Sequence, residues 1–294
     1  MSNFQAGILT PVPRLARYIE FSLVYGADPQ NELKTLATNI ETDTTVVGLG
    51  LSLVQQLNLK INGLDVFPAQ VTESIEIPST PMALWCWLKG DDRGEILHRT
   101  RKISRLLQPA FQLENTIDAF MYGESQDLSG YIDGTENPVD TAAIATAFVA
   151  DQQAGLDGSS FVAVQKWVHN LDVFESFSAT TRDNIIGRRI SDNEEMDDAP
   201  DSAHVKRTAQ ERFTPEAFLL RRSMPWSDER QHGLVFVAFA HSFDAFEAQL
   251  NRMTGKEDGI QDAIFRFTQP VTGNYFWCPP AKENRLDLSY LKIK

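Results

Sequence analysis

The pattern of apolar positions predicts alternating strands and helices in the first half of the chain. Residues 83–88, ALWCWL, are apolar throughout, which is typical of a strand buried on both faces. Apolar residues recur at helical spacing over 33–40 and again over 96–107. With the strand-like segments between them, these helices give the order βαββαβ, in which the strands are residues 17–25, 44–49, 83–88 and 111–122.

The second half repeats this order of elements. Helical spacing over 171–177 and 243–253 separates further strand-like segments, at residues 160–168, 218–222, 233–240 and 275–278. We therefore expect an α+β fold of two ferredoxin-like modules in tandem, each an antiparallel sheet with helices on one face. The predicted modules span residues 1–140 and 141–294. The repeat rests on element order, because the halves share little residue-level identity.

Composition and charge narrow the class of protein. The chain has 294 residues, of which 42% are hydrophobic, as in an ordinary globular protein. Its 27 Lys and Arg face 40 Asp and Glu, and the net charge of −13 argues against nucleic acid and anionic membranes as partners. No apolar stretch reaches the roughly 18 residues of a membrane helix. The N-terminus shows no export signal, so we expect a cytoplasmic protein.

The two cysteines and five histidines limit the metal chemistry. Cys86 and Cys278 lie among large apolar residues, and we expect reduced core thiols rather than a disulfide. No His or Cys pair has the spacing of a zinc site.

Residues 130–138, GYIDGTENP, form the first segment that could carry chemistry. Two glycines and a proline fix an acidic residue, Asp133, in a defined loop. Asp-Gly is also a common turn dipeptide, and turn formation alone explains both glycines. Asp133 by itself therefore does not indicate catalysis.

An acidic segment precedes His204. Six acids fall within residues 191–201, and a charge run of this kind is typical of a solvated loop. The segment lacks the glycine of a calcium-binding loop. A lone histidine is more often structural than a ligand, but one axial imidazole is sufficient for a haem. We expect the other four histidines to take no part in the site.

Two arginines interrupt an apolar strand in residues 218–226, FLLRRSMPW. Alternation along a strand places Arg221 and Arg222 on opposite faces, so one of them points inward. The simpler interpretation is that the arginines reach the surface or pair with buried carboxylates. An inward guanidinium requires such a partner or a ligand.

Together, GYIDGTENP, DSAHVKRT and LLRRSMPW, in this order, resemble the dye-decolourising peroxidases, a haem family, and specifically its short bacterial cytoplasmic branch. The resemblance extends over nearly the whole chain, including the ending QPVTGNYFWCPP. It implies the tandem ferredoxin-like fold, with one haem b per chain bound mainly by the C-terminal module. The family more often has phenylalanine where this chain has Tyr131.

The resemblance also implies the central roles in the site. Asp133 would be the distal acid, which moves a proton between the two oxygens of hydrogen peroxide. Arg221 would stabilise the negative charge that develops as the O–O bond breaks. His204 would be the axial ligand of the haem iron, and Asp262 is the candidate acceptor for its second ring N–H.

Three further residues are candidates for contacts around the haem. Arg188 and Asn137 would contact the anionic propionates or their surroundings. Ser223 would approach the distal cavity.

The predicted function is a peroxidase whose partners are hydrogen peroxide and small aromatic reductants such as phenols and dyes. The alternative is a haem- or porphyrin-handling protein with weak peroxidase activity, and a third interpretation is a structural module with a dead site. The acids before His204 favour cationic or neutral donors over anionic ones.

Two kinds of protein partner complete the predictions. We expect a homo-oligomer. The apolar-interleaved tail LDLSYLKIK, residues 286–294, could dock onto an encapsulating shell protein, although a closing segment packed on its own chain explains it more simply.

Overall fold

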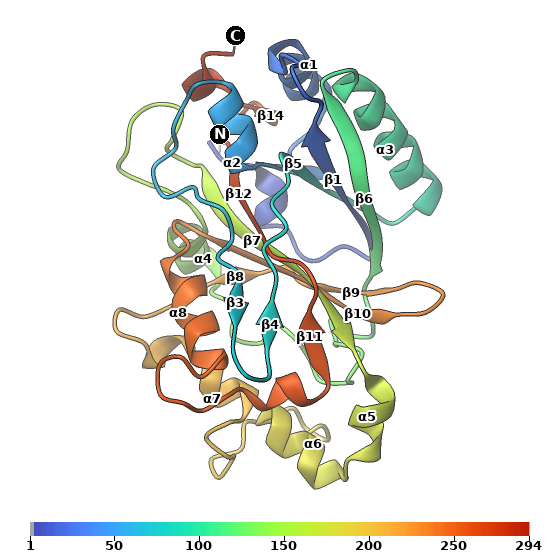
Figure 1. Cartoon of the computed structure of the whole chain (residues 1–294), viewed down its shortest axis with the longest axis vertical. Coiled ribbons are helices and arrows are strands. Elements are labelled where there is room, and N and C mark those ends of the chain that lie inside the picture. Colours follow the sequence, from blue (N-terminus) through green and yellow to red (C-terminus); the bar gives the residue numbers. More distant parts are fainter. Residues whose placement is uncertain (1–2, 294) are drawn as a thin grey trace.

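The structure, a computed structural model that describes residues 3–293, is built around one large sheet with helices packed outside it (Figure 1). The predicted strands of the first half are all present, as β1 (Leu15–Leu23), β2 (Thr45–Leu49), β5 (Leu84–Gly90) and β6 (Phe111–Phe120). Those of the second half are β7 (Ser160–His169), β8 (Leu220–Arg221), β10 (His232–Ala240) and β12 (Asn274–Cys278). Two more strands of the same sheet, β9 (Met224–Ser227) and β11 (Thr268–Pro270), fall outside the predicted segments.

The two halves use the same strand order. The first half is ordered β2-β5-β1-β6 and the second β9-β10-β7-β12, and all these neighbours are antiparallel. The halves then join at two places, where Leu49 pairs with Trp277 and Ala119 pairs with Trp226. The antiparallel α+β architecture is confirmed, but the strands form one closed ring instead of two separate sheets.

The predicted helices are also present, and they are α1 (Gln30–Asn39), α3 (Arg93–Leu107), α5 (Leu171–Ser176) and α8 (Asp244–Met253). Asp92 begins α3 by accepting a hydrogen bond from Glu95 N at 2.8 Å, as an N-cap residue does. The connections contain short elements that the apolar pattern did not predict, namely α2 (Leu51–Gln56), β3 (Gln70–Val71), β4 (Glu76–Ile77), α4 (Asp140–Ala147), α6 (Ala179–Ile186), α7 (His204–Thr208), β13 (Ala281–Lys282) and β14 (Arg285–Leu286).

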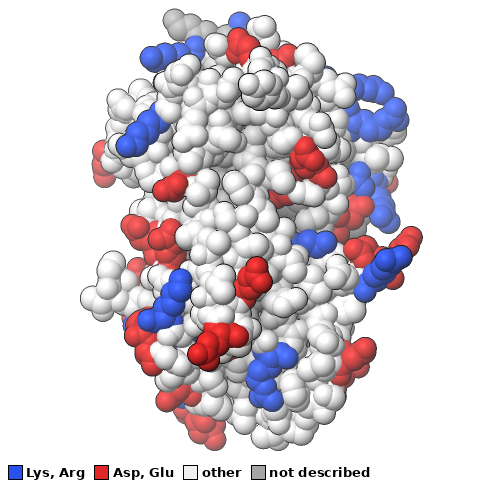
Figure 2. All heavy atoms as spheres, in the orientation of Figure 1, with Lys and Arg blue, Asp and Glu red and all other residues white. Residues whose placement is uncertain are grey.

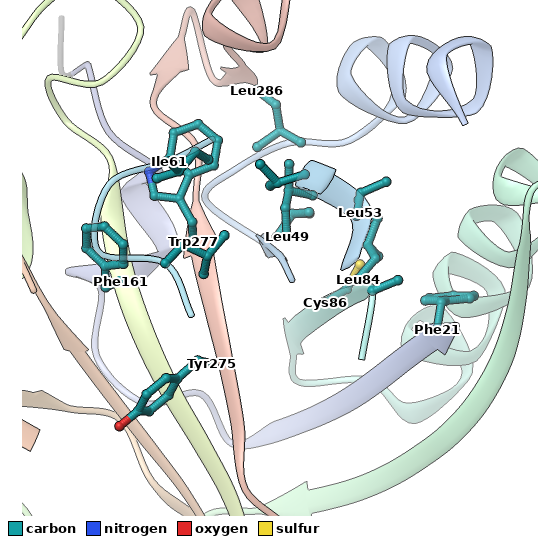
Figure 3. Packing of buried hydrophobic residues seen from close by; sticks show 14 of the residues in the cluster. Phe21, Leu49, Leu53, Ile61, Leu84, Cys86, Phe161, Tyr275, Trp277 and Leu286 are labelled. Carbon is teal, nitrogen blue, oxygen red and sulfur yellow. The ribbon is translucent and has the colours of Figure 1, made fainter. Parts of the chain in front are cut away.

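Strand β5 shows how the core is divided. Cys86 and its neighbours at 84 and 88 pack with α1 and α3 in the outer core, part of which Figure 3 shows. Trp85 and Trp87 point the other way, into a cluster inside the ring. The strand is therefore buried on both faces, as its unbroken apolar run predicted. Cys86 and Cys278 are free and buried, and burial raises the pKa of both thiols.

The C-terminal segment packs on the core. Leu288, Leu291 and Ile293 are buried in the outer core, and Tyr290 Oη donates to Lys60 O at 3.2 Å. The last residue of the predicted tail, 294, lies outside the described residues. These contacts support the closing-segment interpretation of the tail, because its apolar residues are not free to dock elsewhere.

The surface carries charges of both signs, and on the face drawn in Figure 2 acidic and basic side chains are interspersed. Among residues 3–293, no helix combines the length and the apolar character needed to cross a membrane.

Candidate functional site

A cavity with mostly apolar walls lies in the second half of the chain. Strand β10, helix α8 and the segment after Asp262 supply these walls, through Leu234, Phe236, Phe246, Leu250, Met253, Ile264 and Phe267. His204, Asp133 and Arg221 line the same cavity. A concave apolar site with a few converging polar groups is the usual form of a ligand or cofactor pocket.

His204 is held by a buried carboxylate. It is the first residue of α7, and its Nδ1 lies 2.7 Å from Asp262 Oδ2. The Asp262 side chain is 0% exposed, and its other oxygen accepts from Ile264 N at 3.0 Å. Within residues 3–293, His204 Nε2 has no hydrogen-bond partner. A histidine that donates one ring N–H to a carboxylate and leaves the other nitrogen free has the arrangement of a metal ligand.

Asp133 and Arg221 meet at another wall of the cavity. Asp133 Oδ1 lies 3.8 Å from Arg221 Nη2, and their side chains are 26% and 17% exposed. Arg221 Nε is buried and has no hydrogen-bond partner in the described chain. A buried guanidinium N–H without a partner is costly, so this group is well suited to a ligand in the cavity.

The loop that carries Asp133 is fixed at several points. Asp133 N donates to Ser125 O at 3.0 Å, and Gly134 has a φ of +78°, which favours glycine. The hydroxyl of Tyr131, which also lines the cavity, donates to Asp183 Oδ1 at 2.5 Å. Burial and Asp183 raise the pKa of Tyr131. The phenol therefore ties the loop to α6.

Asn137 lies beside Arg221 and does not line the cavity. Its Oδ1 accepts from Arg221 N at 2.7 Å, and its Nδ2 donates to Arg221 O at 3.1 Å. The side chain thus pairs with the backbone of β8 as a neighbouring strand would. Both polar atoms of the side chain are thus engaged by the Arg221 backbone, an arrangement suited to positioning Arg221, and the predicted contact of Asn137 with the propionates or their surroundings stays a prediction.

Arg222 points away from the cavity. Arg222 Nε and Nη2 donate to the carbonyls of Ile8 and Leu9, each at 3.0 Å, so the two arginines do lie on opposite faces. Ser223 Oγ accepts from Val237 N at 3.4 Å. Ser223 is not among the residues that line the cavity, and its approach to the distal cavity stays a prediction.

Arg188 lies at the mouth of the site, outside the apolar cavity. Its guanidinium donates to Glu136 at 3.0 Å, to Glu195, and to Asn193 O at 2.8 Å. It lines an outer groove that also reaches Asp133, His204 and Arg221. Both glutamates are largely exposed, and the predicted contact of Arg188 with the propionates or their surroundings stays a prediction.

Sequence reasoning missed His169 and Asp127. Both line the cavity, and His169 Nε2 lies 2.9 Å from Asp127 Oδ2 while Nδ1 lies 2.6 Å from Thr268 Oγ1. Burial alone would raise the pKa of Asp127, but the hydrogen bonds and charge of His169, with those of Ser129, hold it below the usual range. The expectation that His169 takes no part in the site was therefore wrong. Strand alternation in β7, which turns Gln165, Trp167 and His169 to one side, could have indicated it.

The residues present fit a haem. His204 offers one free imidazole nitrogen, and the walls nearby are apolar and aromatic. Arg221 supplies an unpartnered buried N–H, with Asp133 beside it. Among residues 3–293 no group of three or more His, Cys, Asp or Glu side chains could hold a metal ion. A haem iron needs one axial imidazole from the protein, because the porphyrin supplies its other ligands.

Comparison with known proteins identifies the class. Residues 124–283 match the family model "Dyp-type peroxidase, C-terminal", which covers more than half of the chain. The chain belongs to the Dyp-type peroxidase family.

Individual relatives and structures agree with this assignment. A dye-decolorizing peroxidase of Mycolicibacterium paratuberculosis is 27% identical over 72% of this chain, and the match spans 64% of that relative's length. The structure of a dye-decolorizing protein from V. cholerae superimposes with a TM-score of 0.87 at 25% identity, and covers 98% of this chain and 99% of that one. A DypB variant from Rhodococcus jostii RHA1, solved in complex with heme, has a TM-score of 0.83 at 26% identity, with 92% and 94% covered.

Proposed function

We propose that this protein is a haem-dependent peroxidase that uses hydrogen peroxide to oxidise phenols, dyes and similar small aromatic reductants. The observation that carries the proposal is His204, which is backed by the buried Asp262 and has its second nitrogen free in the cavity that Asp133 and Arg221 share. Family membership and the heme complex of the R. jostii relative support haem b as the cofactor.

The residues divide the chemistry between them. Bound haem supplies the iron at which peroxide is cleaved. His204 Nε2 would hold the iron, and Asp262 would fix the orientation of the imidazole and increase its basicity. Asp133, directly or through a water, takes a proton from one peroxide oxygen and returns it to the departing one. Arg221 stabilises the negative charge that develops on the departing oxygen.

Haem titration tests the proposal directly. Wild-type protein should bind one haem per chain with a strong Soret band and then oxidise a phenol when peroxide is added. The His204→Ala variant should lose this band. His241→Ala is the matched control, because His241 is exposed and its Nδ1 contacts only the carbonyl of Thr146. Wild-type protein that takes up no haem would overturn the proposal. Rapid haem loss together with slow oxidation would favour the haem-handling alternative.

The remaining predictions accompany this function. We propose that residues 1–140 and 141–294 are the two ferredoxin-like modules, and the matching strand orders support this. A cytoplasmic location and a homo-oligomer also stay predictions, which fractionation and light scattering would test.

A further inference from the structure

A second, more polar groove lies directly outside the cavity. It is formed by the end of β7, the start of α5, the β9–β10 hairpin and residues 265–269 (Figure 1). His169, Phe267 and Thr268 line both the groove and the cavity. The wall between the two spaces is therefore one layer of side chains thick.

This wall is well ordered by its own contacts. Both ring nitrogens of His169 are engaged, by Asp127 on one side and Thr268 on the other. The Phe267 ring lies 4.3 Å from the ring of Phe174 and 5.7 Å from that of His169. A ligand in the groove would thus rest against fixed aromatic and imidazole groups.

The groove is basic although the chain as a whole is acidic. Arg230 and Arg266 line it and are exposed, and neither forms an ion pair within residues 3–293. The Arg266 guanidinium lies 4.4 Å from the ring of Phe177. His232 Nε2 is buried there without a hydrogen-bond partner. Asp172 is the one acid among the lining residues of the groove.

The groove at the other side of the site has a different character. Its lining combines five acids, Asp133, Glu136, Glu195, Asp197 and Glu211, with the cations Arg188, Lys206, Arg212 and Arg221. Each of the three arginines lies within ion-pair distance of one or two of these carboxylates. An anion approaching there meets several carboxylates. At the basic groove it meets two guanidinium groups that no carboxylate occupies.

We propose that the basic groove binds a small anionic aromatic reductant, such as a phenol that bears a carboxylate. Arg230 and Arg266 hold the carboxylate, and the aromatic ring lies against the wall formed by His169 and Phe267. This inference rests on the proposed peroxidase function.

The oxidation of such a donor balances with hydrogen peroxide. Two donor molecules each lose one electron and one phenolic proton, and one hydrogen peroxide takes up both electrons and both protons to give two waters. The electrons cross the wall, and the donor stays outside the cavity. The expectation that anionic donors are disfavoured then applies only to the outer groove that Arg188 lines.

Two donors of matched structure test the site. Ferulate carries a carboxylate where coniferyl alcohol carries a neutral hydroxymethyl group. In the holoenzyme, Arg230→Gln and Arg266→Gln should each raise KM for ferulate about 1.5-fold to fivefold, the range expected for loss of one exposed ion pair. KM for coniferyl alcohol and the rate of the peroxide reaction should stay unchanged. Asp172→Asn should lower KM for ferulate.

Arg101→Gln is the matched control, because it removes the same charge from an exposed position on α3. Ferulate binding should also be measured by calorimetry on haem-free and haem-loaded protein, and both should bind it with the same dependence on Arg230 and Arg266. The proposal that the basic groove binds the anionic donor would be overturned if the variants changed KM for ferulate and for coniferyl alcohol equally. It would also be overturned if Arg230→Gln and Arg101→Gln changed KM for ferulate equally. Failure of the wild-type protein to react with peroxide would instead overturn the proposed function.

Discussion

The Nδ1 atom of His204 lies 2.7 Å from a carboxylate oxygen of Asp262 that solvent does not reach. Asp262 is fixed in turn, because it accepts from Ile264 N and its own N–H donates to Met253 O at 2.8 Å. The imidazole orientation therefore depends on a chain of contacts that reaches α8.

Replacing Asp262 should weaken the ligand that it orients. In Asp262→Asn we expect haem to bind through His204, but with a more positive reduction potential and a peroxide reaction slowed about 10- to 100-fold, because the imidazole loses an anionic acceptor. Redox titration and stopped-flow absorption measure the two effects. Asp201→Asn, which changes an exposed acid close to His204 in sequence, should leave both values at wild type. An unchanged potential in Asp262→Asn would contradict the role given to this carboxylate.

Asn137 should act through the position of Arg221. Asn137→Ala removes both hydrogen bonds to the Arg221 backbone, and we expect slower peroxide cleavage with an unchanged Soret band. Asn137→Asp keeps the acceptor for Arg221 N and should fall between Asn137→Ala and wild type. If Asn137 contacts a propionate instead, both variants would weaken haem binding, which a haem titration would detect.

Glu20 gives a prediction about stability and pH. Burial raises its pKa to about 6, although a hydrogen bond from Asn115 opposes the shift. Because the folded pKa lies above the unfolded value of 4.5, Glu20 stabilises the fold below pH 4.5 relative to neutral pH. This stabilisation, about 2 kcal/mol, is lost as pH rises through 6.

Denaturant unfolding at pH 5 and pH 7.5 measures this effect. Glu20→Gln should reduce the difference between the two free energies of unfolding, whereas Glu73→Gln, at an exposed position, should not. The same pH dependence in wild type and Glu20→Gln would show that Glu20 is not the group responsible.

Local pattern predicted most of the fold, and it failed where long-range pairing decides the structure. The run of apolar residues in β5 identified a strand buried on both faces, because that property belongs to the segment itself. The ring closes through pairs such as Leu49 with Trp277, whose strands lie far apart in the chain and carry no local mark of each other. The apolar pattern did not predict α2, β3 and β4, which lie between β2 and β5, because these elements are too short to show a period.

The site was likewise predicted where local motifs mark a residue, and not where contacts between distant segments decide its role. Motifs identified Asp133, His204 and Arg221, and the structure brings all three to one cavity. The roles of Asn137 and Arg188 depend on which neighbours occupy their polar atoms, and sequence spacing does not contain that information. His169 was expected to take no part in the site, and its contact with Asp127 joins two segments 42 residues apart, which sequence spacing does not reveal.

The central claim is that Asp133 assists peroxide cleavage at a haem held by His204. Stopped-flow absorption tests it, when haem-loaded protein is mixed with hydrogen peroxide and the shift of the Soret band is followed. We predict a fast second-order shift in wild type and one at least tenfold slower in Asp133→Asn, with identical spectra before mixing. No shift in wild type, or a wild-type rate in Asp133→Asn, would contradict the account.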